Sequence, residues 1–494
     1  MHFKRNRFLF LISFLLLVMV TSCAPEPPKR EVALYNTYCA SCHIAPRIDE
    51  LPKDIWKNAI LPGMLARMDI EEMYQEPNQV STTFRPKIKL QDWIALQNYI
   101  IELAPEKLAA TPKLVTRPLE QFKAQEVALD TLNGALLTYL DFNEDDNQLN
   151  YGTIAGDLQR YDFQQQTQEK VYQGNTPVTW LNSTDSVQII TEVGILDPSD
   201  LEEGQLVRLV KEDATIIQNE LHRPVGTLYE DLNGDGTMEM VVSEFGDATG
   251  SLSLLVGNAA GNYDKTILLN QPGCIKTLAK DMNNDGKLDI ITMTTQGNES
   301  MTILYQTDDL KFKAERVIDF SPIYGSSWFE LVDYNQDGYD DIITVNGDNA
   351  DKSYVHKPYH GMRIHLNDGE SNFSEAYFYP LNGATRVLAR DFDQDGDVDF
   401  GLISTFPDYE QTPELSFVYL ENLNAKSFDF ASKVLNDANA GRWFLMDAGD
   451  IDADGDEDII LSSFTYVFTP VPDGLAKRWA NSNVDLVILE NKLK

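Results

Sequence analysis

A nine-residue acidic pattern returns five times in the second half of this chain, and it constrains the fold more than any other feature. The copies begin 50, 52, 58 and 59 residues apart, and each is followed by a short apolar run such as IITM or IILS. A repeat of this period predicts a propeller or another array of similar units. The copies are DLNGDGTME at Asp231, DMNNDGKLD at Asp281, DYNQDGYDD at Asp333, DFDQDGDVD at Asp391 and DIDADGDED at Asp450.

Each copy has oxygen-bearing side chains at positions 1, 3, 5 and 9 and glycine at position 6. Such oxygens can converge on one hard cation, the glycine takes the tight turn, and the last carboxylate closes the shell. Solvated acidic turns are the alternative, but five successive copies favour about five calcium sites. The predicted ligands are Asp231, Asn233, Asp235, Glu239, Asp281, Asn283, Asp285, Asp289, Asp333, Asn335, Asp337, Asp341, Asp391, Asp393, Asp395, Asp399, Asp450, Asp452, Asp454 and Asp458.

Strand patterns fill each period. In the first full copy we expect strands around Leu228, Met240, Leu254 and Ile267, which make one four-stranded antiparallel blade. The calcium loop then joins the first two strands of the blade.

Two decayed copies precede these five and bring the count to seven blades. DFNEDDNQL at Asp141 has Asp146 in place of the glycine and Leu149 in place of the last carboxylate, so its calcium binding stays open. LNSTDSVQIIT, near Asp185, keeps the strand pattern and loses the ligands.

The last blade lacks its outermost strand, and the beginning of the propeller supplies a candidate. FKAQEV at Phe122 closely matches FKAERV at Phe312, which is an outermost strand. We expect the Phe122 segment to pair beside residues 486–489 and close the ring, which removes open sheet edges. The sequence thus predicts an all-β seven-bladed propeller over residues 122–494.

The N-terminus has the pattern of an export signal. A basic start is followed by an apolar run over residues 8–20, which is short for a membrane span. VTSC, ending at Cys23, resembles a bacterial lipobox, and this resemblance implies a signal peptide over residues 1–22 and a diacylated Cys23. An uncleaved membrane anchor is the alternative. Residues 23–30 form a Pro-rich tether, and either way the rest of the chain lies outside the cytoplasm, anchored to a bacterial membrane on its periplasmic or outer-membrane face.

YCASCHIAP contains the C-x-x-C-H attachment signal of c-type haem. Two thioethers from Cys39 and Cys42 would hold one covalent haem c, and His43 would be its proximal iron ligand. Export supports this interpretation, because haem is attached outside the cytoplasm. A redox-active or structural disulfide is the alternative, but redox C-x-x-C motifs normally sit in a βαβ setting that is absent here.

Methionine is the common sixth ligand of such a haem. Met64 follows a Pro-Gly bend that can turn its thioether toward a porphyrin, and we favour it. Met68 lies one helical turn later and Met73 lies in an acidic stretch, so the choice between Met64 and Met68 stays open.

A helix is expected before Pro105, with Trp93, Leu96, Ile100 and Leu103 on one face. It would end a small all-α domain over residues 31–105, which resembles a class I cytochrome c. Residues 106–121 have linker composition.

The loops between the second and third strands grow in blades 5 to 7 and emerge on the face opposite the calcium loops. Long loops on a rigid scaffold often bind ligands, although these could also pack on each other or on the haem domain. Their candidate residues are His356, Tyr359, His360, Asp408, Tyr409, Lys477, Arg478 and Trp479.

Composition limits the partners. A formal net charge of −37 disfavours nucleic acid and anionic lipid, which require a basic surface. A hydrophobic content of 43% excludes wholesale disorder. Cys274 stands alone and is expected to be a small buried apolar residue.

Residues 122–494 resemble an integrin-alpha-type propeller of FG-GAP or VCBS repeats, and the whole chain resembles bacterial lipoproteins that join such a propeller to an N-terminal cytochrome c. The resemblance implies calcium binding and haem-mediated electron transfer with an unidentified redox partner, together with docking of a partner or ligand on the enlarged loops. We expect this rather than a stand-alone enzyme. The alternatives are a haem-linked oxidoreductase with a substrate site in the propeller loops, and a calcium-dependent adhesion or glycan-binding module.

Overall fold

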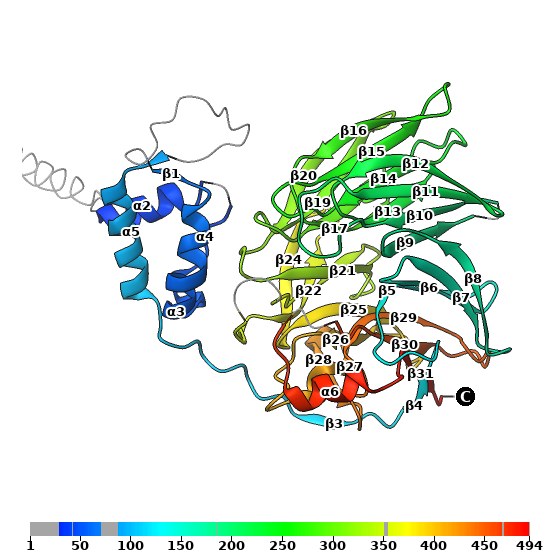
Figure 1. The fold of residues 1–494 in the computed structure, drawn as a ribbon. Coiled ribbons are helices and arrows are strands. Elements are labelled where there is room, and N and C mark those ends of the chain that lie inside the picture. Colours follow the sequence, from blue (N-terminus) through cyan, green and yellow to red (C-terminus); the bar gives the residue numbers. More distant parts are fainter. Residues whose placement is uncertain are drawn as a thin grey trace, which may run out of the picture.

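The computed structural model describes residues 29–41, 43–70, 87–184, 186–349, 354–466 and 469–493. They form a small helical unit followed by a β-propeller, and Figure 1 shows the helical unit, in blue, beside the propeller. None of the helices in these ranges has the length and hydropathy of a membrane span. The predicted signal peptide and Cys23 lie outside the described residues.

The helical unit is built around one apolar cluster. Its elements are α2 (Arg30–Tyr38), η1 (Ile48–Glu50), α3 (Lys53–Ile55), η2 (Trp56–Ile60), α4 (Leu61–Leu65), β1 (Asp69–Ile70), β2 (Lys87–Ile88) and α5 (Leu90–Leu103). The short strands β1 and β2 pair in parallel.

Helix α5 confirms the expected terminal helix, with one correction. Trp93, Leu96 and Ile100 are buried, whereas Leu103 is 52% exposed. Leu103 lies at the edge of the apolar stripe in the last turn, and Ala104 is buried in its place. The helix ends where predicted, because Pro105 restricts Ala104 to the extended backbone that it adopts.

The described strands of the propeller form seven sheets, which confirms the predicted blade count. Each blade uses four consecutive strands, except that the last takes its fourth from the N-terminal side. The strands of blades 1 to 3 are β5 (Leu137–Asn143), β6 (Gln148–Thr153), β7 (Asp157–Asp162), β8 (Thr167–Gln173), β9 (Val178–Ser183), β10 (Gln188–Glu192), β11 (Gly204–Val210), β12 (Asp213–Leu221), β13 (Pro224–Glu230), β14 (Glu239–Glu244), β15 (Ser251–Gly257) and β16 (Tyr263–Leu269).

The remaining strands continue the same order. They are β17 (Cys274–Lys280), β18 (Asp289–Thr294), β19 (Ser300–Asp308), β20 (Lys311–Asp319), β21 (Ser326–Val332), β22 (Asp341–Asn346), β23 (Gly361–Asn367), β24 (Phe373–Pro380), β25 (Ala384–Arg390), β26 (Asp399–Ser404), β27 (Phe417–Asn424), β28 (Asp429–Val434), β29 (Trp443–Gly449), β30 (Asp458–Ser463) and β31 (Leu486–Asn491). Blades 6 and 7 also contain η3 (Pro413–Ser416), η4 (Ala425–Ser427) and α6 (Asp473–Ala480).

The ring is closed by the segment that the sequence predicts. Strand β4 (Phe122–Val127) pairs antiparallel with β31, so that Leu486 faces Val127 and Leu489 faces Ala124. Just before it, β3 (Thr116–Pro118) adds a fifth, parallel strand to blade 6. This second pairing lies in the segment predicted to be a linker.

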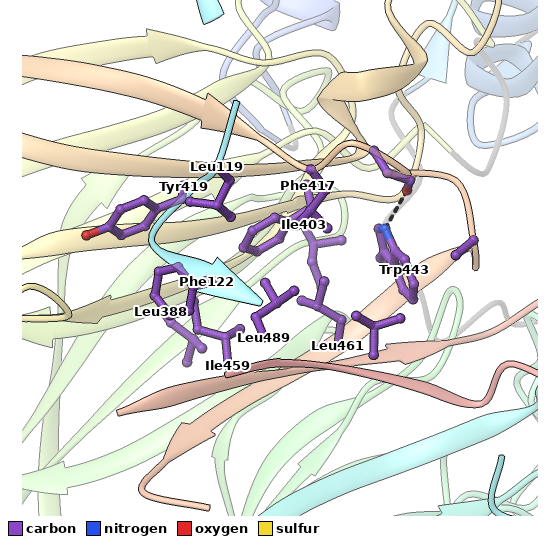
Figure 2. Close-up of a cluster of buried hydrophobic side chains, with 14 of the residues drawn as sticks. Leu119, Phe122, Leu388, Ile403, Phe417, Tyr419, Trp443, Ile459, Leu461 and Leu489 are labelled. Atoms are coloured by element: carbon purple, nitrogen blue, oxygen red, sulfur yellow. Dashed lines mark hydrogen bonds between the residues drawn. The ribbon is translucent and has the colours of Figure 1, made fainter. Parts of the chain in front are cut away.

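The closing segment is anchored by its own side chains. Leu119 and Phe122 belong to a buried cluster that spans blades 6 and 7, as Figure 2 shows. The Phe122 ring meets the ring of Tyr419 edge to face at 5.4 Å. In the same cluster the indole N–H of Trp443 donates to the Ala438 carbonyl at 2.7 Å. We call this closing segment, residues 119–127, the latch. It buries large apolar side chains in addition to pairing its backbone with β31.

Candidate functional site: acidic loops, the C-x-x-C-H segment and the enlarged-loop face

The five acidic loops share one backbone geometry. In the copy at Asp391, the N–H of Asp395 donates to Oδ1 of Asp391 at 3.1 Å and the N–H of Gly396 donates to Oδ2 at 3.0 Å. The same two bonds recur in the other four copies. Gly396 has φ +99°, a conformation that favours glycine and explains position 6 of the pattern.

Two of these loops bring three carboxylates together. One oxygen from each of Asp391, Asp393 and Asp395 lies within 4.8 Å of the others, and the same holds for Asp450, Asp452 and Asp454. The other three loops have asparagine at position 3. Clustered carboxylate oxygens are the donor set that calcium prefers, so these residues fit the ion.

Asp397, at position 7 of its loop, adds to this fit. Its Oδ1 is buried and has no hydrogen-bond partner among the described residues. Burial and the neighbouring carboxylates Asp395, Asp393 and Asp391 raise its pKa to about 6. A cation bound in this loop would compensate the repulsion. Position 7 was not among the ligands predicted from the sequence.

The carboxylates at position 9 are buried and tie each loop to its blade. In blade 5, Oδ2 of Asp341 accepts from the N–H of Tyr334 at 3.1 Å and Oδ1 accepts from the N–H of Asn367 at 2.8 Å. Burial raises the pKa of Asp341 to about 6. Both oxygens therefore already accept backbone N–H groups, and a ligand role for position 9 stays a prediction.

In blades 5 to 7, an asparagine in the third strand also binds the position-9 carboxylate. These asparagines were not predicted from the sequence. Asn367, Asn422 and Asn491 each donate a backbone N–H to the position-9 carboxylate. Their side-chain amides donate to the carbonyl of the residue just before that carboxylate. The recurring strings HLN, YLEN and ILEN carry this signal in the sequence.

The two decayed copies differ from these loops. Asp141 lies inside β5, opposite Asn150, and the chain turns directly into β6. In blade 2 the turn is closed by Thr184, whose N–H donates to the Val187 carbonyl at 2.9 Å. Asp185 lies outside the described residues.

The C-x-x-C-H segment begins where α2 ends. Cys39 is 3% exposed and shares the apolar cluster of the helical unit with Trp56 and Trp93. Burial raises the pKa of its thiol to about 12. Redox-active cysteines have a lowered pKa and partial exposure, so this environment weighs against the redox alternative.

His43 has a geometry that suits an iron ligand. Its Nδ1 lies 2.8 Å from the carbonyl oxygen of Ile44. When Nδ1 carries the proton and donates to that carbonyl, Nε2 keeps the lone pair that binds a metal. Cys42 lies outside the described residues.

Two of the candidate methionines contact the same apolar cluster. Met68 belongs to its buried part with 9% exposure, and Met64 packs against it from α4. Both methionines therefore contribute to the apolar core that also contains Cys39. Met73 lies outside the described residues.

The enlarged loops pack on one another. The rings of Tyr409 and Trp479 meet at 5.6 Å, and the indole N–H of Trp479 donates to the Asn439 carbonyl at 2.9 Å. His356 Nδ1 lies 3.5 Å from a carboxylate oxygen of Asp408. Lys477 and Arg478 lie in the last turn of α6. These contacts favour the packing alternative for Tyr409 and Trp479.

Tyr359 joins this face to the helical unit. Its hydroxyl donates to the Glu50 carbonyl at 2.9 Å, and its ring stacks on Tyr324 with centroids 5.1 Å apart. Ile323 packs against the apolar cluster of the helical unit. The neighbouring His360 is 1% exposed, and burial lowers its pKa well below the ordinary value. The blade connection that carries Ile323 and Tyr324 has no distinguishing sequence signal.

Comparisons with known proteins agree with the repeat geometry. A profile described as FG-GAP-like repeat matches residues 231–292 and 281–344. This part of the propeller consists of FG-GAP-like repeats. None of the curated proteins compared with the chain matches it.

Solved structures resemble the chain at low identity. The N-terminal domain of Nup159 is 12% identical with a TM-score of 0.42, over 77% of this chain and 99% of that one. The Pan2 WD40 domain of Neurospora crassa is 13% identical with a TM-score of 0.45, over 76% and 98%. An auxiliary nutrient binding protein from Bacteroides thetaiotaomicron is 11% identical with a TM-score of 0.36, over 57% and 74%.

Proposed function

We propose that this chain is an exported, lipid-anchored monohaem c-type cytochrome whose FG-GAP-like propeller binds calcium, and that it acts in electron transfer and in docking a partner or ligand. One observation carries the proposal. Cys39 is buried at the end of α2, in the apolar cluster that contains Met68 and against which Met64 packs, and the Nδ1 of His43 lies 2.8 Å from a backbone carbonyl oxygen.

The residues of the helical unit fit haem c. Cys39 and Cys42 would hold it covalently, and His43 would bind its iron through Nε2. Met64, or Met68 in its place, would supply the sixth ligand. Haem bound here would supply reversible one-electron chemistry. The apolar cluster would exclude water from the porphyrin, and the Ile44 carbonyl would fix the orientation of the His43 ring.

Covalent attachment tests this assignment. We would produce the full chain in a host with haem-attachment machinery and measure its mass and its haem content after acid-acetone extraction. We expect one haem that resists extraction, reduced attachment in Cys39→Ser and Cys42→Ser, and none in the double variant. Cys274→Ala is the matched control, because Cys274 is buried in blade 4 and should not affect haem. A wild-type chain that yields no extraction-resistant haem would reject the proposal.

Calcium would serve the propeller as a stiffening ion. Bound at the loops, it would neutralise the carboxylates that crowd together on one face of a chain with a net charge of −37. The loops at Asp391 and Asp450 have the strongest support, because each gathers three carboxylates. We propose calcium binding at all five loops, since their backbone geometry is shared.

The lipid anchor is proposed from the sequence alone. Growth with labelled palmitate should label the wild-type protein, and Cys23→Ser should remove the label and release the protein from the membrane fraction. Label that persists in Cys23→Ser would contradict the anchor. The redox partner is unidentified, and we propose no nucleic acid partner.

A further inference from the structure

A chamber of about 1710 Å³ occupies the centre of the propeller. The first strands of all seven blades line it, from β5 round to β29. It extends to the enlarged-loop face, because Asp348 and Tyr466 from that face line it, and Ile60 and Arg67 of the helical unit border it as well. Pockets for small molecules are usually smaller than this chamber, so it has room for a ligand with its water.

Arg386 stands out in the wall of this chamber. Its guanidinium carbon lies 4.4 Å from the ring centre of Trp328 and 5.8 Å from that of Phe444. Among the described residues it donates one hydrogen bond, from NH1 to the Thr385 carbonyl, and it forms no ion pair. Burial lowers its pKa to about 10, so it stays charged at neutral pH.

Arg223, which also lines the chamber, has a different environment. Its guanidinium donates to three backbone carbonyls, those of Ile195, Leu196 and Gly246. Arg223 is therefore a structural clamp. Among the described residues, the Nε and NH2 donors of Arg386 have no hydrogen-bond partner. Because Arg386 lines the chamber, a bound ligand could accept from them.

Two other charged residues near Arg386, Lys276 and Glu330, pair with each other. The Lys276 ammonium contacts the Glu330 carboxylate at 2.9 Å and also donates to the Phe329 carbonyl. The same carboxylate oxygen accepts the indole N–H of Trp328 at 3.0 Å, which fixes the ring that supports Arg386. Asp348, which also lines the chamber, favours the charged form of Arg386 through its negative charge. The guanidinium therefore stays charged and is held on fixed aromatic rings.

We propose that the chamber binds a small molecule bearing a carboxylate on a six-membered ring, such as a uronic acid or an aromatic acid, with the carboxylate on Arg386. A planar guanidinium matches a carboxylate through two parallel N–H bonds. Aromatic side chains such as Trp180 and Phe444 also line the chamber and offer faces for the ring of the ligand. This inference goes beyond the proposed function, because it requires neither haem nor calcium.

Titration calorimetry on the full chain tests the site. The probes are D-glucuronate and benzoate, with inorganic phosphate and sulfate as comparison anions. We expect one of the two acids to bind with one-to-one stoichiometry, and Arg386→Gln to weaken binding about tenfold or more. Arg386→Lys keeps the charge but loses the paired N–H groups, and it should weaken binding measurably. Arg316→Gln is the matched control, because Arg316 is exposed on β20 and pairs with Asp319.

Melting curves show which variants fold, and Arg386→Lys provides the test if Arg386→Gln does not fold. Three results would overturn the proposal. They are no binding of either acid at millimolar concentration, binding of phosphate or sulfate alone, and binding of an acid that both Arg386 variants leave unchanged. None of these results depends on haem. The calorimetry can therefore reject the acid site while haem attachment is confirmed, and the reverse is equally possible.

Discussion

The hydroxyl of Tyr359 donates a hydrogen bond to the backbone carbonyl of Glu50, and this bond joins the fifth propeller blade to the helical unit. The two residues are 309 positions apart in the chain. The Tyr359 carbonyl in turn accepts from Arg363 at 2.7 Å, so the blade holds the tyrosine in place. The helical unit is therefore docked by a specific polar contact beside the apolar contact of Ile323.

Tyr359→Phe should loosen this docking. It removes one hydrogen bond of about 1 kcal/mol and keeps the stacked ring. We expect faster amide hydrogen exchange around Glu50 with unchanged exchange in blades 1 to 3. Tyr354→Phe, in the same loop at a residue that is 53% exposed, is the control. Equal exchange in both variants would show that the bond contributes nothing to docking.

Phe122→Ala should destabilise the propeller strongly. The ring is 4% exposed and packs on Phe392 and Tyr419, so its loss should cost about 3–5 kcal/mol. Denaturant unfolding followed by tryptophan fluorescence measures the effect. Lys123→Ala changes only an exposed ion pair with Glu490 and should cost less than about 1 kcal/mol. A loss for Phe122→Ala no larger than that of Lys123→Ala would argue against the latch.

The latch also shows how much of the fold the sequence predicts. Repeated strings in the sequence predicted the pairing of β4 with β31. FKAQEV matches FKAERV, an outermost strand, and the last blade lacks such a strand. The same reasoning could not find β3. Its residues Thr116, Arg117 and Pro118 have linker composition and pair with blade 6 only because the latch brings them there.

Glu299 should make stability depend on pH. It is 3% exposed, and burial raises its pKa to about 7 from an ordinary value of 4.5. The folded state then binds the proton more tightly than the unfolded state, so this group's contribution to stability is lost as pH rises from about 4.5 to 7.

Glu299→Gln isolates this contribution. The difference in unfolding free energy between wild type and variant should shift against the wild type by up to about 3 kcal/mol between pH 4.5 and 8. Denaturant unfolding across this range measures it. A difference that stays constant with pH would mean that Glu299 titrates normally.

Asp454→Asn should remove one calcium site without unfolding its loop. Oδ1 of Asp454 accepts the N–H of Asp456 at 3.2 Å, and an asparagine oxygen can keep this bond while the charge is lost. We expect calcium titration to show one site weakened out of about five. Asp145→Asn in blade 1, whose loop lacks the shared geometry, should leave the titration unchanged. An equal effect of both substitutions, or no calcium binding by the wild type, would contradict the assignment.

Residue patterns predicted the repeated acidic loops but not the residues whose contacts lie outside them. Spacing alone located the five loops and the glycine at position 6, because the chain turns locally within each copy. Calcium binding by positions 1, 3 and 5 stays a prediction. Tyr324 and Arg386 were missed, because their roles depend on residues of other loops or neighbouring blades. Asp397 was missed because position 7 differs among the five copies. Leu103 was predicted on one helix face with Trp93, Leu96 and Ile100, yet it is exposed, because helical spacing does not show where the neighbouring elements stop covering a helix.

The most direct test of haem-mediated electron transfer is the reduced-minus-oxidised absorption spectrum of the purified full chain, measured beside Met64→Ala and Met68→Ala. We expect a covalently held haem that is reversibly reduced, with the methionine-ligated signature lost in Met64→Ala and kept in Met68→Ala. Loss in Met68→Ala alone would move the sixth ligand to Met68. A chain without haem, or with a spectrum that reductant leaves unchanged, would contradict electron transfer as its function.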